Sequence, residues 1–139
     1  MHSHETHIRI PFHDVDSMNI VWHGYYAKYF EVARCELLES FNYSYDEMFQ
    51  SGYAWPIVDM RAKYILPLKF HQNIVVRSEL SEWENRLKIN YIIRDRDSNA
   101  THSKGHTTQM AICLKTNETL FESPDVLLER VLKMDKGGE

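Results

Sequence analysis

The sequence lacks several features that would point to particular classes of protein. It has two cysteines in 139 residues and no internal repeat or low-complexity block, so neither a disulfide scaffold nor a repeat array is expected. Its longest plain apolar run, Met110 to Leu114, is far too short to span a membrane. With 16 basic and 20 acidic side chains the net charge is −4, which argues against a general binder of nucleic acid or anionic membranes.

The size and composition are those of an ordinary globular domain. We expect residues 1–139 to form a single domain, with 43% apolar and 26% charged residues. The first ten residues carry charge and no apolar stretch, so no signal peptide is expected. Cys35 and Cys113 lie within apolar patterns and are expected to be buried free thiols, which favours a reducing, cytoplasmic location.

The spacing of apolar residues predicts an α+β fold. Period-two alternation predicts five strands, at residues 5–12, between Pro56 and Pro67, and at 73–83, 86–95 and 105–115. Helical spacing predicts one long amphipathic helix over residues 24–40, whose apolar face is Tyr26, Phe30, Ala33, Leu37 and Phe41. We therefore expect one long helix on one face of a mostly antiparallel sheet.

Shorter signals complete this prediction. Residues 44–51 are expected to add a helical turn, and Ser123-Pro124-Asp125 predicts a closing helix that runs to about Met134. That helix start has a hydroxyl for capping and a proline at the first helical position. The ends, Met1 to His4 and residues 136–139, are expected to be frayed.

Most of the polar side chains that could take part in catalysis lie between the first predicted strand and the long helix. Residues 12–26 contain two carboxylates, Asp14 and Asp16, with a hydroxyl and two histidines. A helix start offers unpaired N–H groups and a positive dipole end, which stabilise a developing oxyanion. A carboxylate held nearby can attack a carbonyl or activate a water. From spacing alone, however, such residues are more often turn and capping groups, so the assignment is open at this point.

Residues 12–34, FHDVDSMNIVWHGYYAKYFEVAR, resemble the opening motif of 4-hydroxybenzoyl-CoA thioesterase-like proteins, in particular the YbgC-like acyl-CoA thioesterases. The matching positions are Asp14, Asp16, Val21, Trp22, His23, Tyr26, Tyr29, Phe30, Glu31, Ala33 and Arg34. Two departures stand out. Asn19 replaces a usual Gly, although Asn tolerates a left-handed backbone, and His71-Gln72 replace the Gly-Asp or Asp-Asp usual before the third strand.

The resemblance implies a hotdog fold, in which a curved antiparallel sheet wraps around the helix at 24–40. It implies a homodimer whose subunits join their sheets, with active sites at the interface, and pairing of dimers into a homotetramer. Asp16 would be the catalytic carboxylate, as nucleophile or general base, and the His23 amide would polarise the carbonyl. The His23 side chain would orient water or assist the leaving thiolate, whereas Asp14 would hold the loop.

The implied substrate is a thioester of coenzyme A or of an acyl carrier protein, with a small or medium acyl group, aromatic ones included. No metal and no separate cofactor are expected, because coenzyme A is part of the substrate. Trp22 and Tyr25 are the candidates for the acyl pocket. The phosphates are expected to meet basic residues, of which the candidates are Arg86 and Lys88, with Lys63 and Lys69 as further possibilities.

Two other functions stay open. A hotdog dehydratase would act on 3-hydroxyacyl thioesters, but its chemistry uses a histidine base with an acidic partner, which the x-D-x-D loop suits less well. A non-catalytic module would bind acyl-CoA or acyl carrier protein without turnover. The histidines near the N-terminus are not expected to form a metal site, because a mobile tail lacks fixed ligand geometry.

Overall fold

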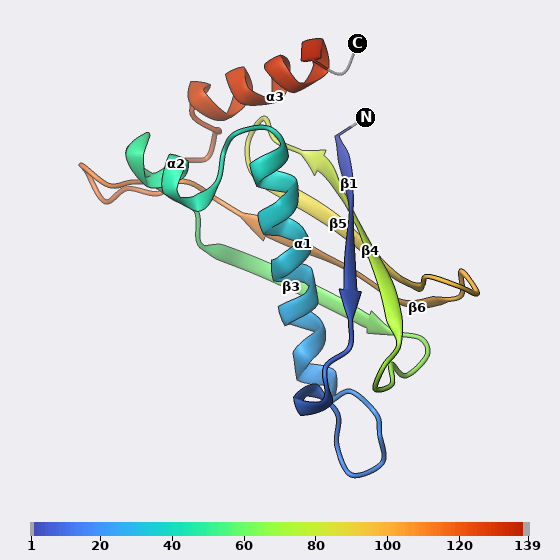
Figure 1. Cartoon of the computed structure of the whole chain (residues 1–139). Helices are drawn as coiled ribbons and strands as arrows, with labels where there is room; N and C mark the ends of the chain where they lie inside the picture. Colours follow the sequence, from blue (N-terminus) through green and yellow to red (C-terminus); the bar gives the residue numbers. More distant parts are fainter. Residues whose placement is uncertain (1, 138–139) are drawn as a thin grey trace.

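The computed structural model describes residues 2–137, and its main elements follow the predicted order (Figure 1). Five antiparallel strands form one sheet in the order β1-β4-β5-β6-β3. These strands are β1 (Ser3–Arg9), β3 (Ile57–Tyr64), β4 (Asn73–Glu82), β5 (Leu87–Asp95) and β6 (Thr101–Gln109). A separate two-stranded ribbon pairs β2 (Tyr53–Ala54) with β7 (Ile112–Cys113).

One long helix, α1 (Tyr26–Ser40), crosses the inner face of this sheet (Figure 1). It continues from a 3-10 turn, η2 (His23–Tyr25), and its five predicted apolar residues are all buried. An earlier 3-10 turn, η1 (Phe12–Asp14), and two further helices, α2 (Tyr45–Gln50) and α3 (Asp125–Gly137), complete the elements. The predicted arrangement of one long helix on one face of an antiparallel sheet is therefore confirmed.

The core lies between α1 and the inner face of the sheet. The alternating residues of β5 that face α1 are buried as predicted; they are Leu87, Ile89, Tyr91 and Ile93. The ring of Phe30 stacks on that of Tyr91 with centroids 4.6 Å apart. A Cβ at Gly105 would lie 2.7 Å from the Phe30 ring, so glycine lets α1 approach β6 closely.

The boundaries of the first and the last long strand differ from the prediction. The last long strand covers 101–109 instead of 105–115, because the chain leaves the sheet after Gln109 and forms β7 separately. The first strand ends at Arg9, and Phe12 belongs to η1 with 74% of its surface exposed. The predicted fraying of 1–4 is wrong for Ser3 and His4, which pair with β4, while Met1 lies outside the described residues.

Three smaller expectations also change. The closing helix begins at Asp125, one residue after the predicted first position at Pro124, and the buried Ser123 hydroxyl has no hydrogen-bond partner within residues 2–137, so the expected cap is not formed. Cys35 and Cys113 are free thiols, yet only half-buried. At the C-terminus α3 extends to Gly137, so fraying from residue 136 is wrong there, and residues 138–139 lie outside the described part.

Strand β3 forms one edge of the sheet and is exposed on both faces. Its inner face presents apolar side chains, with Val58, Met60 and Tyr64 each exposing about half of their surface (52%, 48% and 50%). Its outer face presents the charged residues Asp59, Arg61 and Lys63, which alternate with them. Strand β3 pairs with β6 along one side only. In the single chain its other side is therefore an uncovered edge of the sheet, formed by an amphipathic strand.

Candidate active site

The loop between η1 and η2 is held as a tight hairpin. The Asn19 amide donates to the Asp16 carbonyl at 3.0 Å, and the Asp16 amide donates to the Ile20 carbonyl at 2.9 Å. Asn19 has φ = 65°, a left-handed conformation that asparagine tolerates better than most residues. Bridges from Val15 to Val21 and from Ile20 to the β3–β4 loop fix the two arms. The loop therefore presents Asp16 in a defined place.

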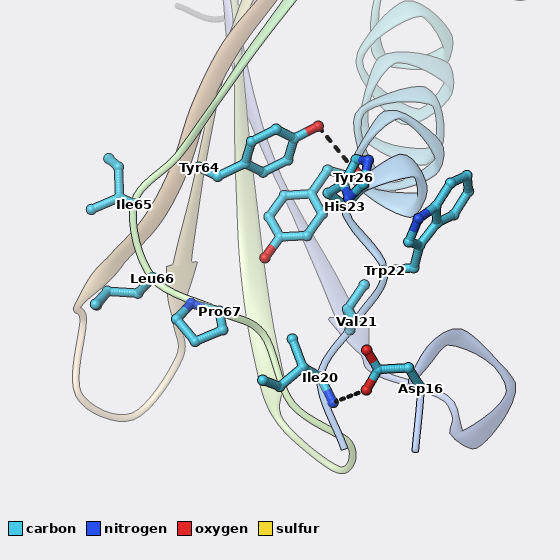
Figure 2. Close-up of a pocket in the computed structure, with 10 residues that line it drawn as sticks. All are labelled: Asp16, Ile20, Val21, Trp22, His23, Tyr26, Tyr64, Ile65, Leu66 and Pro67. Atoms are coloured by element: carbon cyan, nitrogen blue, oxygen red, sulfur yellow. Dashed lines mark hydrogen bonds between the residues drawn. The ribbon is translucent and has the colours of Figure 1, made fainter. Parts of the chain in front are cut away.

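Only one oxygen of the Asp16 carboxylate is used to hold the loop. Oδ1 accepts hydrogen bonds from the amides of Met18 at 2.9 Å and Ile20 at 3.2 Å, the second of which is visible in Figure 2. Oδ2 has no hydrogen-bond partner among the described residues. Asp16 is exposed in the single chain. One oxygen thus anchors the side chain and leaves the other available for chemistry.

The start of η2 supplies unpaired amides. Trp22 precedes the turn without giving it a side-chain cap, and the N–H groups of His23 and Gly24 have no acceptor among residues 2–137. Tyr64 of β3 donates its hydroxyl hydrogen bond to the His23 carbonyl at 3.1 Å, which ties the turn to the sheet (Figure 2). These two amides are available to an oxygen atom of a ligand.

Asp16 and His23 line one pocket of about 360 Å³, whose lining residues are drawn in Figure 2. Its lining consists of Asp16, Ile20, Val21, Trp22, His23, Tyr26, Tyr64, Ile65, Leu66 and Pro67. The rings of Tyr26 and Tyr64 meet edge to face at 4.8 Å. Burial raises the pKa of Tyr26, whose oxygen accepts a hydrogen bond from the Leu68 amide at 3.2 Å. Most of the wall is apolar.

Asp14 is buried, and its hydrogen bonds link the elements that form this site. Its carboxylate is buried and accepts hydrogen bonds from Lys28 at 2.5 Å and Tyr29 at 2.8 Å, both on α1. Burial alone raises the pKa of Asp14, but the hydrogen bonds from Lys28 and Tyr29 outweigh it and hold the pKa below its ordinary value. Since the Asp14 carbonyl also accepts from the Trp22 amide at 3.3 Å, this residue joins the loop, the turn and the helix.

The structure brings Asp16, Trp22 and His23 to the pocket, but not the other three candidates. The Tyr25 ring lies under Lys28, with the ammonium 4.6 Å from the ring centroid, and is not part of the lining. Arg86 and Lys88 lie where β5 begins, at the opposite end of the sheet from Tyr64. Arg86 also pairs with Glu82 at 3.1 Å. Their assignment to phosphates stays a prediction.

Sequence reasoning missed one wall of the pocket as a functional region. That wall runs from Tyr64 to Pro67, at the end of β3. Pro67 marked the end of a strand, but nothing in the alternation shows that this end meets the start of α1.

Within residues 2–137 there is no group of three or more His, Cys, Asp or Glu side chains arranged to hold a metal ion. None of the helices in that range is long and apolar enough to cross a membrane.

Comparison with known proteins shows what this arrangement is similar to. The profile of the "Thioesterase-like superfamily" matches residues 10–131. "Putative esterase sll0410" of Synechocystis is 26% identical over 131 residues, covering 94% of this chain and 79% of that one. An Arabidopsis chloroplastic acyl-acyl carrier protein thioesterase, ATL3, is 31% identical over 78 residues, covering 56% of this chain and 41% of that one.

Solved structures agree over the full length. A DHNA-CoA thioesterase from Staphylococcus aureus superposes with a TM-score of 0.81 at 23% identity, covering 100% of this chain and 97% of that one. At this identity the likeness concerns the fold, and it confirms the expected hotdog arrangement of a curved antiparallel sheet around a long helix.

Proposed function

Because the chain belongs to the thioesterase-like superfamily, we propose that it hydrolyses an acyl-CoA thioester to the free acid and coenzyme A. The catalytic groups in this proposal are the Asp16 carboxylate and the backbone amide of His23. An acyl carrier protein is the alternative thiol carrier, as in the name of the Arabidopsis relative. The free cysteines favour a reducing compartment, and we place the reaction in the cytoplasm.

One observation carries the proposal, namely that the Asp16 carboxylate, held through one oxygen, and the unpaired amide of His23 belong to residues that line the same pocket. During hydrolysis the carbonyl oxygen gains negative charge, which N–H groups at a helix start stabilise. The amide of His23 is the donor that we propose for that oxygen. Asp16 Oδ2 then acts on the carbonyl carbon or on the water that attacks it.

In both routes every bond broken and every proton moved is accounted for by Asp16, the thioester and water. As a nucleophile, the carboxylate forms a mixed anhydride and expels the thiolate, and water then hydrolyses the anhydride. As a general base, it takes a proton from water while the water attacks. The exposed His23 side chain is able to orient the water or to protonate the leaving thiolate in either route.

The walls of the pocket favour an acyl group of small or medium size, aromatic ones included. Ile20, Val21 and Trp22 form one side, and Leu66 and Pro67 form the other. At about 360 Å³ the pocket falls toward the lower end of the range for small-molecule sites, roughly 300–1,000 Å³. Trp22 is 54% exposed in the single chain and offers a flat surface for an acyl group.

We further propose a homodimer in which β3 pairs antiparallel with β3 of a second subunit. The uncovered edge and apolar inner face of β3 support this, since both are otherwise left to water. Antiparallel pairing would bring the partner's beginning of β3 beside Tyr64 and so enclose the pocket. It would also bring the partner's Arg86 and the partner's Lys88 toward this pocket, because they lie at the same end of the sheet as the start of β3. This supports their assignment to CoA phosphates. Pairing of two such dimers into a homotetramer belongs to the same proposal.

The test is thiol release from a panel of acyl-CoA and acyl-carrier thioesters by the Asp16→Asn variant. Asparagine keeps an oxygen that accepts from the Met18 and Ile20 amides, so the loop should survive while the charge is lost. We expect kcat to fall by at least ~10²-fold, as for removal of a principal catalytic group. Asp97→Asn, on an exposed turn, is the matched control and should keep full activity.

Near-normal turnover by Asp16→Asn would rule out this role for the carboxylate. A dehydratase would instead release water from 3-hydroxyacyl thioesters without freeing thiol. A binding module would bind the thioester tightly with no turnover, and Asp16→Asn would then change nothing but affinity.

A further inference from the structure

The outer face of the sheet, opposite α1, has a hollow with a basic lining. It measures about 240 Å³ and is lined by Arg61 and Lys63 of β3 and by Lys104, Gly105 and His106 of β6. In the strand register Arg61 pairs with His106, and Lys63 pairs with Lys104. Side chains of such pairs project from the same face, so the four basic groups surround one point. We refer to these five residues as the basic hollow.

Three of these groups have no counter-charge. Arg61, Lys63 and Lys104 form no ion pair or side-chain hydrogen bond with any residue that the structure describes, whereas His106 contacts Asp59 at 3.1 Å. Arginines of β4 and β5 on the same face are each within ion-pairing distance of a glutamate. The unpaired charge is therefore concentrated here, in a chain whose net charge is −4.

Such an arrangement costs stability in the empty protein. Like charges placed directly opposite each other on neighbouring strands are destabilising. Lysines on an edge strand alone would be explained as protection against unwanted pairing. Two of the four basic groups, however, are Lys104 and His106 on β6, which is covered by strands on both sides. Edge protection does not account for Lys104, whereas an anionic ligand accounts for all three unpaired groups, since His106 already contacts Asp59.

We propose that the basic hollow binds the phosphate of the phosphopantetheine arm, the group that coenzyme A and acyl carrier proteins share. This inference rests on the proposed thioesterase function. Lys63 and Tyr64 are consecutive on β3 and project to opposite faces, so the hollow and the pocket lie across the same end of the sheet. The pantetheine arm is a long flexible chain that runs from the thioester sulfur to this phosphate, and it passes around the end of β3.

The assignment divides the phosphates between two places. The phosphate next to pantetheine, common to both carriers, goes to the basic hollow. The remaining phosphates, which only coenzyme A has, are left for Arg86 and Lys88. Loss of the hollow should therefore weaken binding of either carrier, and loss of Arg86 and Lys88 should weaken binding of coenzyme A alone.

The kinetic test compares two thioesters of the same acyl group, one on coenzyme A and one on N-acetylcysteamine, which has no phosphate. For the Lys63→Met/Lys104→Met double variant we expect KM for the acyl-CoA to rise about 5- to 20-fold with kcat unchanged, as for the loss of two exposed charge pairs. KM for the N-acetylcysteamine thioester should not change. High salt should shrink the difference, because these charges are exposed. Lys115→Met, on a distant exposed turn, is the control.

A binding test separates this proposal from the proposed function. Calorimetry with 4′-phosphopantetheine and with pantetheine should show that the phosphate tightens binding to the unaltered protein but not to the double variant. That result does not depend on turnover, whereas failure to hydrolyse any thioester would count against the hydrolase alone. An acyl-carrier thioester that shows the same KM effect extends the assignment to that carrier.

Equal KM values for the double variant and the unaltered protein on acyl-CoA would overturn the proposal, as would equal binding of the two pantetheine compounds. Misfolding is not expected to confuse these results. Removing like charges from facing positions should leave the midpoint of thermal unfolding unchanged or raise it. A variant that is more stable but binds phosphate more weakly would be the signature of a ligand site.

Discussion

Gly24 should matter because an indole occupies the space where any other residue would put its side chain. A Cβ built at Gly24 would lie 2.3 Å from the nearest atom of the Trp22 ring. Its backbone is not in the left-handed region, so alanine can adopt the conformation of the chain there. The three atoms nearest to that Cβ all belong to the Trp22 ring, so the main conflict of Gly24→Ala is with one wall of the pocket.

The size of the effect follows from that contact. Non-bonded carbons settle at about 3.5 Å, so the indole would have to move by roughly 1.2 Å from the 2.3 Å contact. Trp22 is 54% exposed and can move toward water, while alanine is a better helix former than glycine by up to ~1 kcal/mol. We expect little change in the free energy of unfolding. Misplacement by about 1 Å at a reacting site costs up to ~10²-fold, so kcat/KM should fall at least ~10-fold.

The assay is a double-mutant cycle on thiol release, with Trp22→Ala as the second change. If the indole transmits the damage, Gly24→Ala should have almost no effect in a chain that already lacks the ring. Urea unfolding of all four proteins would check that stability is comparable. Equal losses of kcat/KM with and without the indole would refute the reasoning, as would a Gly24→Ala enzyme of normal activity.

Two further predictions concern the support of the site. Asp14→Ala should lower the free energy of unfolding by about 2–4 kcal/mol in urea titrations, because it leaves the buried Tyr29 hydroxyl unpaired and unties the loop. Since the pKa of Asp14 is lowered from 3.8 in the folded chain, this difference should be constant above about pH 5 and shrink as the pH falls below 3.8. Met60→Asp, on the half-exposed inner face of β3, should dissociate the proposed dimer in sedimentation experiments and lower activity with it, while leaving the circular dichroism of the chain unchanged. A fully active monomer would contradict the two-subunit site.

The sequence predicts those elements whose own residues alternate clearly. The apolar faces of α1 and β5 are where the periodicity put them, because burial on one side imposes a period on the side chains. Strand β6 shows the opposite case. Its sequence, THSKGHTTQ, has no apolar alternation, and it is a strand because β5 and β3 supply hydrogen bonds on both sides. The predicted strand over 105–115 rested on the apolar residues 110–114, of which Ile112 and Cys113 form the separate strand β7.

The candidate site divides in the same way. Asp16, Trp22 and His23 lie close together along the chain, so a motif can identify them before any fold is known. Tyr64 and Pro67 reach the pocket through the pairing of β3 with β6 and the packing of α1, which are contacts between distant parts of the chain. No local pattern reports such contacts, and this explains why one wall was predicted and the other was not.

In the proposed dimer, one surface of the second subunit would cover both Asp16 and β3, which are exposed in the single chain. Stabilisation of an oxyanion by fixed amides depends on keeping water out, because water would screen the charge and compete for the amides. In the single chain Asp16 is exposed and Tyr64 is half-exposed, so the pocket is open on the side toward the free edge. A second β3 placed along that edge would cover apolar side chains that have no other partner and would close the pocket at the same time. The catalytic and the assembly proposals therefore support each other through Tyr64, which lines the pocket, stands at the end of the edge strand and holds the turn that carries the amides.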